Sequence, residues 1–184
     1  MSNLNRQILF NTKDIGKLKV IQAKKFLKKV NKTLKINIYK LKIVKKNVQN
    51  ILNNYDIICD CSDNFTTRYL LNDFCLENKK ILISAAINKF EAHVFNFNFS
   101  KKIPCYRCFM PEIPSEEDKC DTEGILPTVA GIAGTLQANE VVKSILSKKD
   151  MLVGKMIVFN TLSLNFRTIK LTRSADCVMG CSKR

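Results

Sequence analysis

Two close pairs of cysteines constrain the fold of this chain more than any other feature. Cys105 and Cys108 form a C-x-x-C pair, and Cys177 and Cys181 form a second pair about 70 residues further along. Two thiolate pairs that a fold brings together make a tetrahedral four-cysteine site for Zn²⁺, a closed structural geometry without an open position for catalysis. The alternative is that either pair is a buried apolar contact. We expect a fold that joins residues 105–108 to the C-terminal end of the chain.

The other four cysteines have different surroundings. Cys59, Cys61 and Cys75 lie in apolar stretches, where a free cysteine behaves as a small hydrophobic residue, so we expect all three in the core. Cys120 stands in a polar, acidic loop ahead of a Gly- and Ala-rich helix, and it is either a reactive thiol or an incidental loop cysteine. The polar N-terminus and the lack of an apolar run near the ~18 residues of a membrane span predict a cytoplasmic protein without disulfides.

The net charge of +15 is concentrated at one end of the chain. Residues 1–50 hold fourteen Lys and Arg against one acid, Asp14. A basic surface attracts nucleic acid or an acidic protein. Without an RNA-binding aromatic motif we do not expect nucleic acid, whereas an acidic protein partner remains open. A plainer explanation is that Lys, Asn and Ile are enriched together, as in an AT-rich genome, with the lysines on the solvent face of a helix.

Alternating helix and strand patterns predict a single α/β domain over residues 1–184. The sheet is expected to be doubly wound and mostly parallel, with an antiparallel strand over residues 90–99 and antiparallel strands at the C-terminal end. The expected helices cover residues 14–30, 47–53, 64–79 and 128–147, and the expected strands cover residues 36–44, 55–61, 80–86, 90–99, 155–160 and 164–172.

Several polar residues have the chemistry of a nucleotide site. Asp63 directly follows the strand at 55–61, where open α/β sheets bind ligands, and a carboxylate there can hold Mg²⁺. The alternative is that Asp63 and its neighbour Asn64 cap the following helix. Arg6 and Lys19 are the charge types that a triphosphate needs, although each alone is one more surface base. The single histidine, His93, excludes a histidine-based metal centre, and we expect it to be structural.

Five short segments follow one another in the order typical of one family. They are S-N-L-N-R-Q at residues 2–7, D-I-G-K-L-K-V at 14–20, C-S-D-N at 61–64, P-C-Y-R-C at 104–108, and G-I-L-P-T-V-A-G through Q-A-N-E at 124–140. Together they resemble the ThiF/MoeB/HesA superfamily over nearly the whole chain. These bacterial relatives of ubiquitin-activating enzymes adenylylate ubiquitin-like sulfur-carrier proteins.

The resemblance implies a Rossmann-like nucleotide-binding domain and an ATP-dependent reaction. The substrate would be the C-terminal glycine of a carrier with a Gly-Gly tail, in thiamine or molybdopterin synthesis. ATP and Mg²⁺ would serve the reaction, and Zn²⁺ the cysteine site. The resemblance also implies a homodimer, and a cysteine desulfurase is a further candidate partner.

The matching motifs carry the family's roles onto individual residues. Arg6 would contact the phosphates, Lys19 the region of the transferred α-phosphate, and Asp63 the Mg²⁺. Cys120 falls where the family often has a thiol that bonds the activated carrier, although acids around it would disfavour a thiolate. The implied ATP-binding set is Ser2, Asn3, Leu4, Asn5, Arg6, Lys19, Asp63 and Asn64.

The sequence departs from the family pattern in two places. The second cysteine pair is C-x-x-x-C, where the family usually shows C-x-x-C. The Gly-rich turn that cradles nucleotide phosphates is not found among the six glycines. We therefore expect a domain that lacks the first two strands and that turn. The alternative functions are a zinc-stabilised docking module without catalysis, one half of a split enzyme, or an enzyme that adenylylates a small carboxylate or a modified tRNA base.

Overall fold

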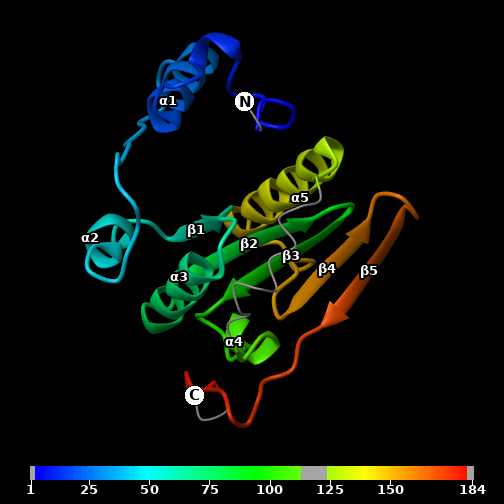
Figure 1. The fold of residues 1–184 in the computed structure, drawn as a ribbon. Coiled ribbons are helices and arrows are strands. Elements are labelled where there is room, and N and C mark those ends of the chain that lie inside the picture. Colours follow the sequence, from blue (N-terminus) through cyan, green and yellow to red (C-terminus); the bar gives the residue numbers. More distant parts are fainter. Residues whose placement is uncertain (1–2, 113–123, 182–184) are drawn as a thin grey trace. The chain divides into compact units, whose positions relative to one another are not determined.

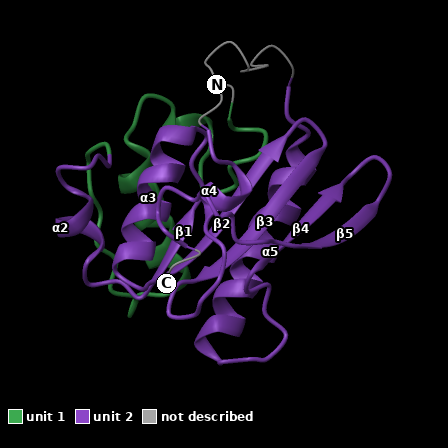
Figure 2. Ribbon diagram, turned by 90° about the horizontal axis from the view of Figure 1, so that it is seen from below, with its two compact units in different colours: residues 1–42 green, residues 43–184 purple. Residues whose placement is uncertain are grey.

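The computed structural model describes residues 3–112 and 124–181 of the chain (Figure 1). The chain forms two compact units, residues 1–42 and residues 43–184, and each is described by itself (Figure 2). A single domain over residues 1–184 stays a prediction.

The first unit contains a short 3₁₀ helix, η1 (Thr12–Asp14), and the helix α1 (Lys19–Val30). The Asp14 carboxylate accepts a hydrogen bond from the Asn11 N–H (3.2 Å) and so caps η1 instead of the longer helix. The predicted helix therefore begins later than expected, at Lys19.

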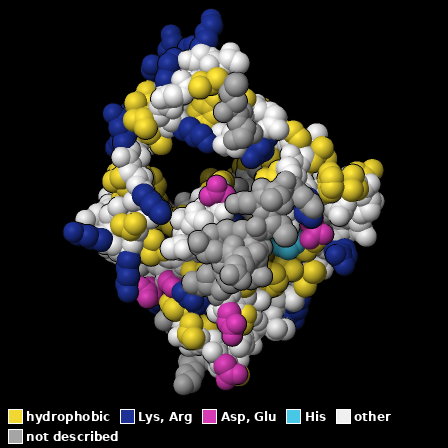
Figure 3. Space-filling view, in the orientation of Figure 1, with side chains coloured by type: hydrophobic (Ala, Val, Ile, Leu, Met, Phe, Trp, Pro, Cys, Tyr) yellow, Lys and Arg dark blue, Asp and Glu magenta, His cyan; other side chains and the backbone are white. Residues whose placement is uncertain are grey.

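The apolar side of α1 is not buried as the sequence pattern predicted. None of its residues is buried, and the side chains of Phe26 and Val30 are 40% and 71% exposed. The first unit provides few other elements against which this side can pack. Basic side chains cover much of the helix surface (Figure 3).

The second unit is a five-stranded sheet with helices on both faces, and its strand order is β1-β2-β3-β4-β5. Its elements are α2 (Val48–Leu52), β1 (Ile57–Asp60), α3 (Phe65–Glu77), β2 (Ile81–Asn88), β3 (Glu91–Asn98), α4 (Tyr106–Phe109), α5 (Pro127–Ile145), β4 (Lys155–Asn160) and β5 (Asn165–Lys170). The predicted α/β class is confirmed, and the antiparallel C-terminal strands are present.

The parallel part of the sheet is smaller than predicted. β1 pairs with β2 in parallel, and the other three pairs are antiparallel. A short turn at Lys89 (φ 48°) and Phe90 joins β2 to β3, and so short a connection can join only antiparallel neighbours, as predicted for residues 90–99. The strand expected over residues 36–44 is also wrong: β1 is the edge strand of the described sheet, and this segment does not extend it.

Helices α3 and α5 cover opposite faces of the sheet. Phe95 and Phe97 of β3 belong to the main core under α3, whereas Ala92 on the other face contacts Val129 of α5 in a smaller core. Because successive side chains of β3 point to opposite faces of the sheet, this strand contributes residues to both cores.

The three cysteines expected in the core divide between inside and outside. Cys75 in α3 is fully buried, as predicted, but Cys59 and Cys61 are exposed. In β1, Ile58 and Asp60 face the side that α3 covers, so Cys59 and Cys61 face the other side. There, α5 packs on β2 and β3 and leaves much of the edge strand open.

Candidate functional site

The structure brings the four predicted metal-binding cysteines together. Their Sγ atoms all lie within 4.8 Å of one another. The Sγ atom of Cys105 is 4.0 Å from that of Cys108 and 3.7 Å from that of Cys177. These distances exclude a disulfide, whose sulfurs are about 2.05 Å apart, and they match the roughly 3.8 Å between sulfurs of a tetrahedral zinc site.

The extra residue of the C-x-x-x-C pair is accommodated by a tight turn. The Gly180 N–H donates to the Cys177 carbonyl (2.7 Å), and Gly180 has a φ of 64°, in the left-handed region that favours glycine. Burial is the main cause that raises the pKa of the Cys105 thiol to about 12, and it also raises the pKa of Cys181. A cation must therefore displace protons when it binds, and a set of four sulfurs suits Zn²⁺ instead of an oxygen-preferring ion.

The first cysteine pair is fixed to helix α3 by two polar contacts. The Tyr106 N–H donates to the side-chain oxygen of Asn72 (2.8 Å). Arg107 donates two hydrogen bonds to the Asp73 carboxylate, at 2.8 and 2.7 Å, and its guanidinium lies 4.5 Å from the centre of the Tyr69 ring. We did not predict these partners, although the arginine inside P-C-Y-R-C was a visible signal.

The loop after β1 presents the predicted magnesium ligand. Asp63 is exposed and accepts a long hydrogen bond from the Asn64 side chain (3.4 Å). Asn64 caps α3 by accepting the Thr67 N–H (2.9 Å), so the capping alternative holds for Asn64. Asp63 is accessible to solvent, and a carboxylate in that position can hold Mg²⁺ together with water.

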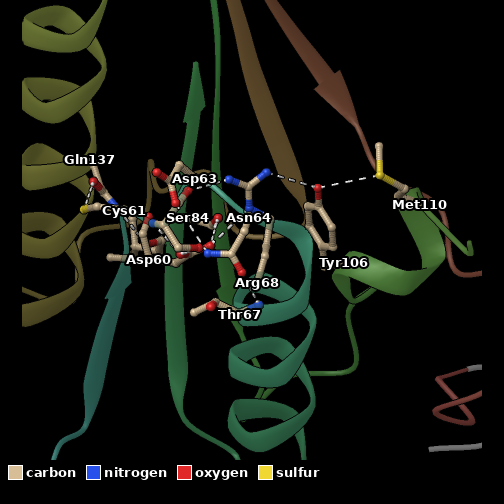
Figure 4. A network of polar contacts seen from close by, with 12 residues as sticks. Asp60, Cys61, Asp63, Asn64, Thr67, Arg68, Ser84, Tyr106, Met110 and Gln137 are labelled. Carbon is tan, nitrogen blue, oxygen red and sulfur yellow. Dashed lines mark hydrogen bonds and ion pairs between the residues drawn. The ribbon is translucent and has the colours of Figure 1, made fainter. Parts of the chain in front are cut away.

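A buried acid missed by the sequence reasoning lies directly behind this loop (Figure 4). Asp60 is 1% exposed, and its carboxylate accepts hydrogen bonds from the Ser84 hydroxyl (2.8 Å) and the Ser62 hydroxyl (2.6 Å). Arg68 of α3 forms an ion pair with Asp60 (3.3 Å) and is itself nearly buried. Burial opposes the charge of Arg68, but its hydrogen bond to Tyr106 and the neighbouring Asp60 leave its pKa raised.

Helix α5 contributes Gln137 to the same region. Its amide nitrogen donates to the carbonyls of Asp60 (2.9 Å) and Ile83 (2.8 Å), so it ties α5 to β1 and β2. Its oxygen accepts the Cys61 S–H (3.2 Å). Burial and the nearby Asp60 raise the pKa of the Cys61 thiol. The Q-A-N-E segment was noted in the sequence, but no role was assigned to its glutamine.

The first unit brings two of its predicted ATP-binding motifs together. The Lys19 ammonium donates to the Asn3 side-chain oxygen (3.2 Å). Both residues line a pocket of about 170 Å³ that Leu4 and Gly16 also line. Arg6 donates to the Asn5 side chain (3.1 Å). The pocket is also lined by Asp14 and Lys17, whereas Arg6 is not among its lining residues.

Some predicted site residues are not described. Ser2 and Cys120 lie outside the described residues, so their predicted roles stay predictions. His93 lies on β3 with its Nε2 atom 2.9 Å from the Glu91 carboxylate, a contact within the sheet that fits its predicted structural role. Within the described part of the chain, no helix has the length and apolar character that crossing a membrane requires.

The model of the ThiF family matches residues 1–179. A protein of Pyropia yezoensis, named as a probable molybdopterin-synthase adenylyltransferase, is 44% identical over 174 residues, which are 93% of this chain and 46% of that protein. A protein of Culex quinquefasciatus, named adenylyltransferase and sulfurtransferase MOCS3, is 37% identical over 99% of this chain and 42% of its own length. The chain spans a little under half the length of these curated relatives.

The fold has solved counterparts. Escherichia coli MccB with ATP superposes with a TM-score of 0.80 at 23% sequence identity, covering 97% of this chain and 55% of that one. MccB in complex with N-formylated MccA gives a TM-score of 0.82 at 21% identity, covering 97% and 56% of the two chains. At this level of identity the likeness shows the fold alone.

Proposed function

We propose, because this chain belongs to the ThiF family, that it takes part in the ATP-dependent adenylylation of a ubiquitin-like sulfur-carrier protein. The observation that carries the proposal is 44% identity, over 93% of the chain, to a relative named as a probable molybdopterin-synthase adenylyltransferase. That name favours molybdopterin synthesis over thiamine synthesis as the pathway.

The proposed reaction needs little covalent chemistry from the protein. A carboxylate oxygen of the carrier's terminal glycine attacks the α-phosphorus of ATP. The bond from that phosphorus to the bridging oxygen breaks, and pyrophosphate leaves with the electron pair. The protein's task is then positioning and charge stabilisation. Arg6 and Lys19 would face the phosphates, and Asp63 would hold Mg²⁺, which lowers the negative charge that the attacking carboxylate meets.

The cysteine cluster is proposed to hold Zn²⁺ in a structural role. Four sulfur ligands would fill the coordination sphere of Zn²⁺ and leave no position for a substrate. The two contacts to α3 would connect the metal site to the main body of the second unit. A homodimer, a cysteine desulfurase as partner, acceptor chemistry at Cys120 and a cytoplasmic location are further proposals that rest on the family resemblance.

Carrier-dependent exchange of radiolabelled pyrophosphate into ATP tests the reaction. We expect exchange with a carrier that ends in Gly-Gly and none with a carrier that lacks the last glycine. Asp63→Ala should lower the rate by about 100-fold or more. Asp56→Ala is the matched control, because Asp56 is an exposed acid just before the other end of β1. Carrier binding without exchange would instead support the docking module.

A further inference from the structure

The backbone N–H and C=O of Ser62, the residue before the proposed magnesium ligand, are both held by one buried ion pair. The Ser62 N–H donates to the Asp60 carboxylate (2.9 Å). The Ser62 carbonyl accepts a hydrogen bond from Nη2 of Arg68 (2.9 Å), and Nε of the same guanidinium bonds Asp60 (3.3 Å). The Arg68 side chain of α3 thus helps to fix the backbone of Ser62, the residue directly before Asp63.

The guanidinium is itself held in place. Arg68 is 7% exposed, and its charged group lies 5.7 Å from the centre of the Phe65 ring. The same group also lies 5.8 Å from the centre of the Tyr106 ring, and Figure 4 shows both side chains. Nη1 of Arg68 also reaches the Tyr106 hydroxyl at 3.5 Å. The planar guanidinium of Arg68 lies near two aromatic rings and has little freedom to rotate. A lysine has a single ammonium group and cannot reproduce the paired N–H donors of the guanidinium.

Asp63, in contrast, has little support of its own. It is exposed, and the hydrogen bond it accepts from Asn64 is long, at 3.4 Å. Its position therefore depends on the backbone of Ser62. Because a ligand carboxylate must be placed to within about 0.5 Å for productive geometry, the support of that backbone matters for metal binding.

We propose that Arg68 is a positioning residue that holds the loop of residues 60–64 and so places Asp63 for Mg²⁺ and ATP. The inference rests on the proposed adenylylation. Arg68 is buried and acts through Ser62 and Asp60, both of which it contacts.

The chain supplies a matched control in its second arginine–aspartate pair. Arg107 and Asp73 also join α3 to a neighbouring element, and Arg107 also lies against a tyrosine ring. None of the contacts described for that pair reaches residues 60–64. A general loosening of α3 would affect both pairs, whereas positioning of Asp63 would affect only Arg68.

The test compares Arg68→Gln, Arg68→Lys and Arg107→Gln in the full chain. In carrier-dependent exchange, Arg68→Gln should raise the apparent KM for Mg²⁺ at least ten-fold and leave the KM for the carrier within two-fold. Arg68→Lys should fall between Arg68→Gln and wild type, and Arg107→Gln should change neither constant beyond two-fold. If Arg68→Gln does not fold, Arg68→Lys carries the same comparison.

Amide hydrogen exchange provides a readout that needs neither ATP nor carrier. The amide of Ser62, which donates to the Asp60 carboxylate, should exchange at least ten-fold faster in the Arg68 variants than in Arg107→Gln. Equal exchange in both sets, or an equal rise in the KM for Mg²⁺, would overturn the positioning role. If the wild type catalyses no exchange into ATP, the proposed function fails, while the amide rates still decide the positioning of the loop.

Discussion

The Sγ atoms of Cys105 and Cys177 lie 3.7 Å apart, although 72 positions separate the two residues in the chain. The segment between them includes α5, β4 and β5. A metal bound by these cysteines therefore closes a long loop and reduces the entropy of the unfolded chain, as a disulfide across the same loop would.

Removal of one ligand should release the metal and destabilise the second unit. We expect Cys177→Ala to lower the zinc content from about one ion per chain to near zero and to lower the melting temperature clearly, because structural zinc contributes folding free energy directly. Metal analysis and thermal unfolding measure both effects.

The control for this variant is Cys59→Ala, which removes an exposed thiol from β1. It should keep both the metal and the melting temperature. If the wild type purified without chelator holds no zinc, or if Cys177→Ala retains it, the assignment of the four ligands is wrong.

Gln137 should contribute more to stability than its helix position suggests. Gln137→Ala leaves the carbonyls of Asp60 and Ile83 without the amide donor they share, and the expected cost is about 1–3 kcal/mol. Asn139→Ala, two residues further on the same helix and exposed, should cost less than about 0.5 kcal/mol. Urea unfolding of both variants makes the comparison, and equal losses would contradict the proposed tie between α5 and the sheet.

Tyr69 should make the folded state sensitive to alkaline pH. Burial, followed by the nearby Tyr106, raises the pKa of Tyr69 from 10 to about 12 in the folded chain. The single proton of its hydroxyl is shared between the carbonyls of Met110 (2.7 Å) and Glu112 (2.9 Å). The unfolded chain releases this proton more readily, so the stabilisation is complete below pH 10 and is lost as the pH rises to about 12.

The free energy of unfolding, measured between pH 8 and pH 12, shows whether the stabilisation by Tyr69 is lost as the pH rises. Tyr69→Phe should be less stable than wild type at pH 8, and the difference should shrink between pH 10 and pH 12. Tyr55→Phe changes a more exposed tyrosine and serves as the control. A difference that stays constant with pH would mean that the two hydrogen bonds, and not the ionisation of the phenol, account for the effect.

Most elements of the second unit could be predicted because their patterns are local. The apolar runs at 55–61 and 80–86 and the alternation over 90–99 correspond to β1, β2 and β3. The direction of a strand is not local, however. The alternation over residues 90–99 predicted the antiparallel direction of β3, but the extent of the parallel part of the sheet was overestimated, because only β1 and β2 pair in parallel.

The candidate site was predictable where spacing alone defines it. Two close cysteine pairs have the spacing of a metal site whatever the path of the chain between them, so the cluster could be predicted from the sequence, and the structure brings the pairs together. The partners of Asp60 were missed because burial decides their role: an acid at the end of an apolar strand looks like a solvent-facing residue until Arg68, eight positions further on, turns back over it.

Asp60, the last residue of β1, and Asp63, in the loop that follows, offer a last test, because their substitution should have different effects. Asp60 is buried against Arg68, so Asp60→Asn leaves a nearly buried guanidinium without its counter-charge, at a cost of about 3–5 kcal/mol. Asp63 is exposed, so Asp63→Asn should change stability by less than about 0.5 kcal/mol. The same Asp63→Asn protein should nevertheless lose Mg²⁺-dependent exchange of pyrophosphate into ATP, because the amide is a poor ligand for Mg²⁺. Urea unfolding gives the free energy of unfolding of each variant, and pyrophosphate exchange gives the activity of each. An Asp63→Asn protein with full exchange would remove Asp63 from the magnesium site, and an Asp60→Asn protein as stable as wild type would show that the buried ion pair does not hold the loop.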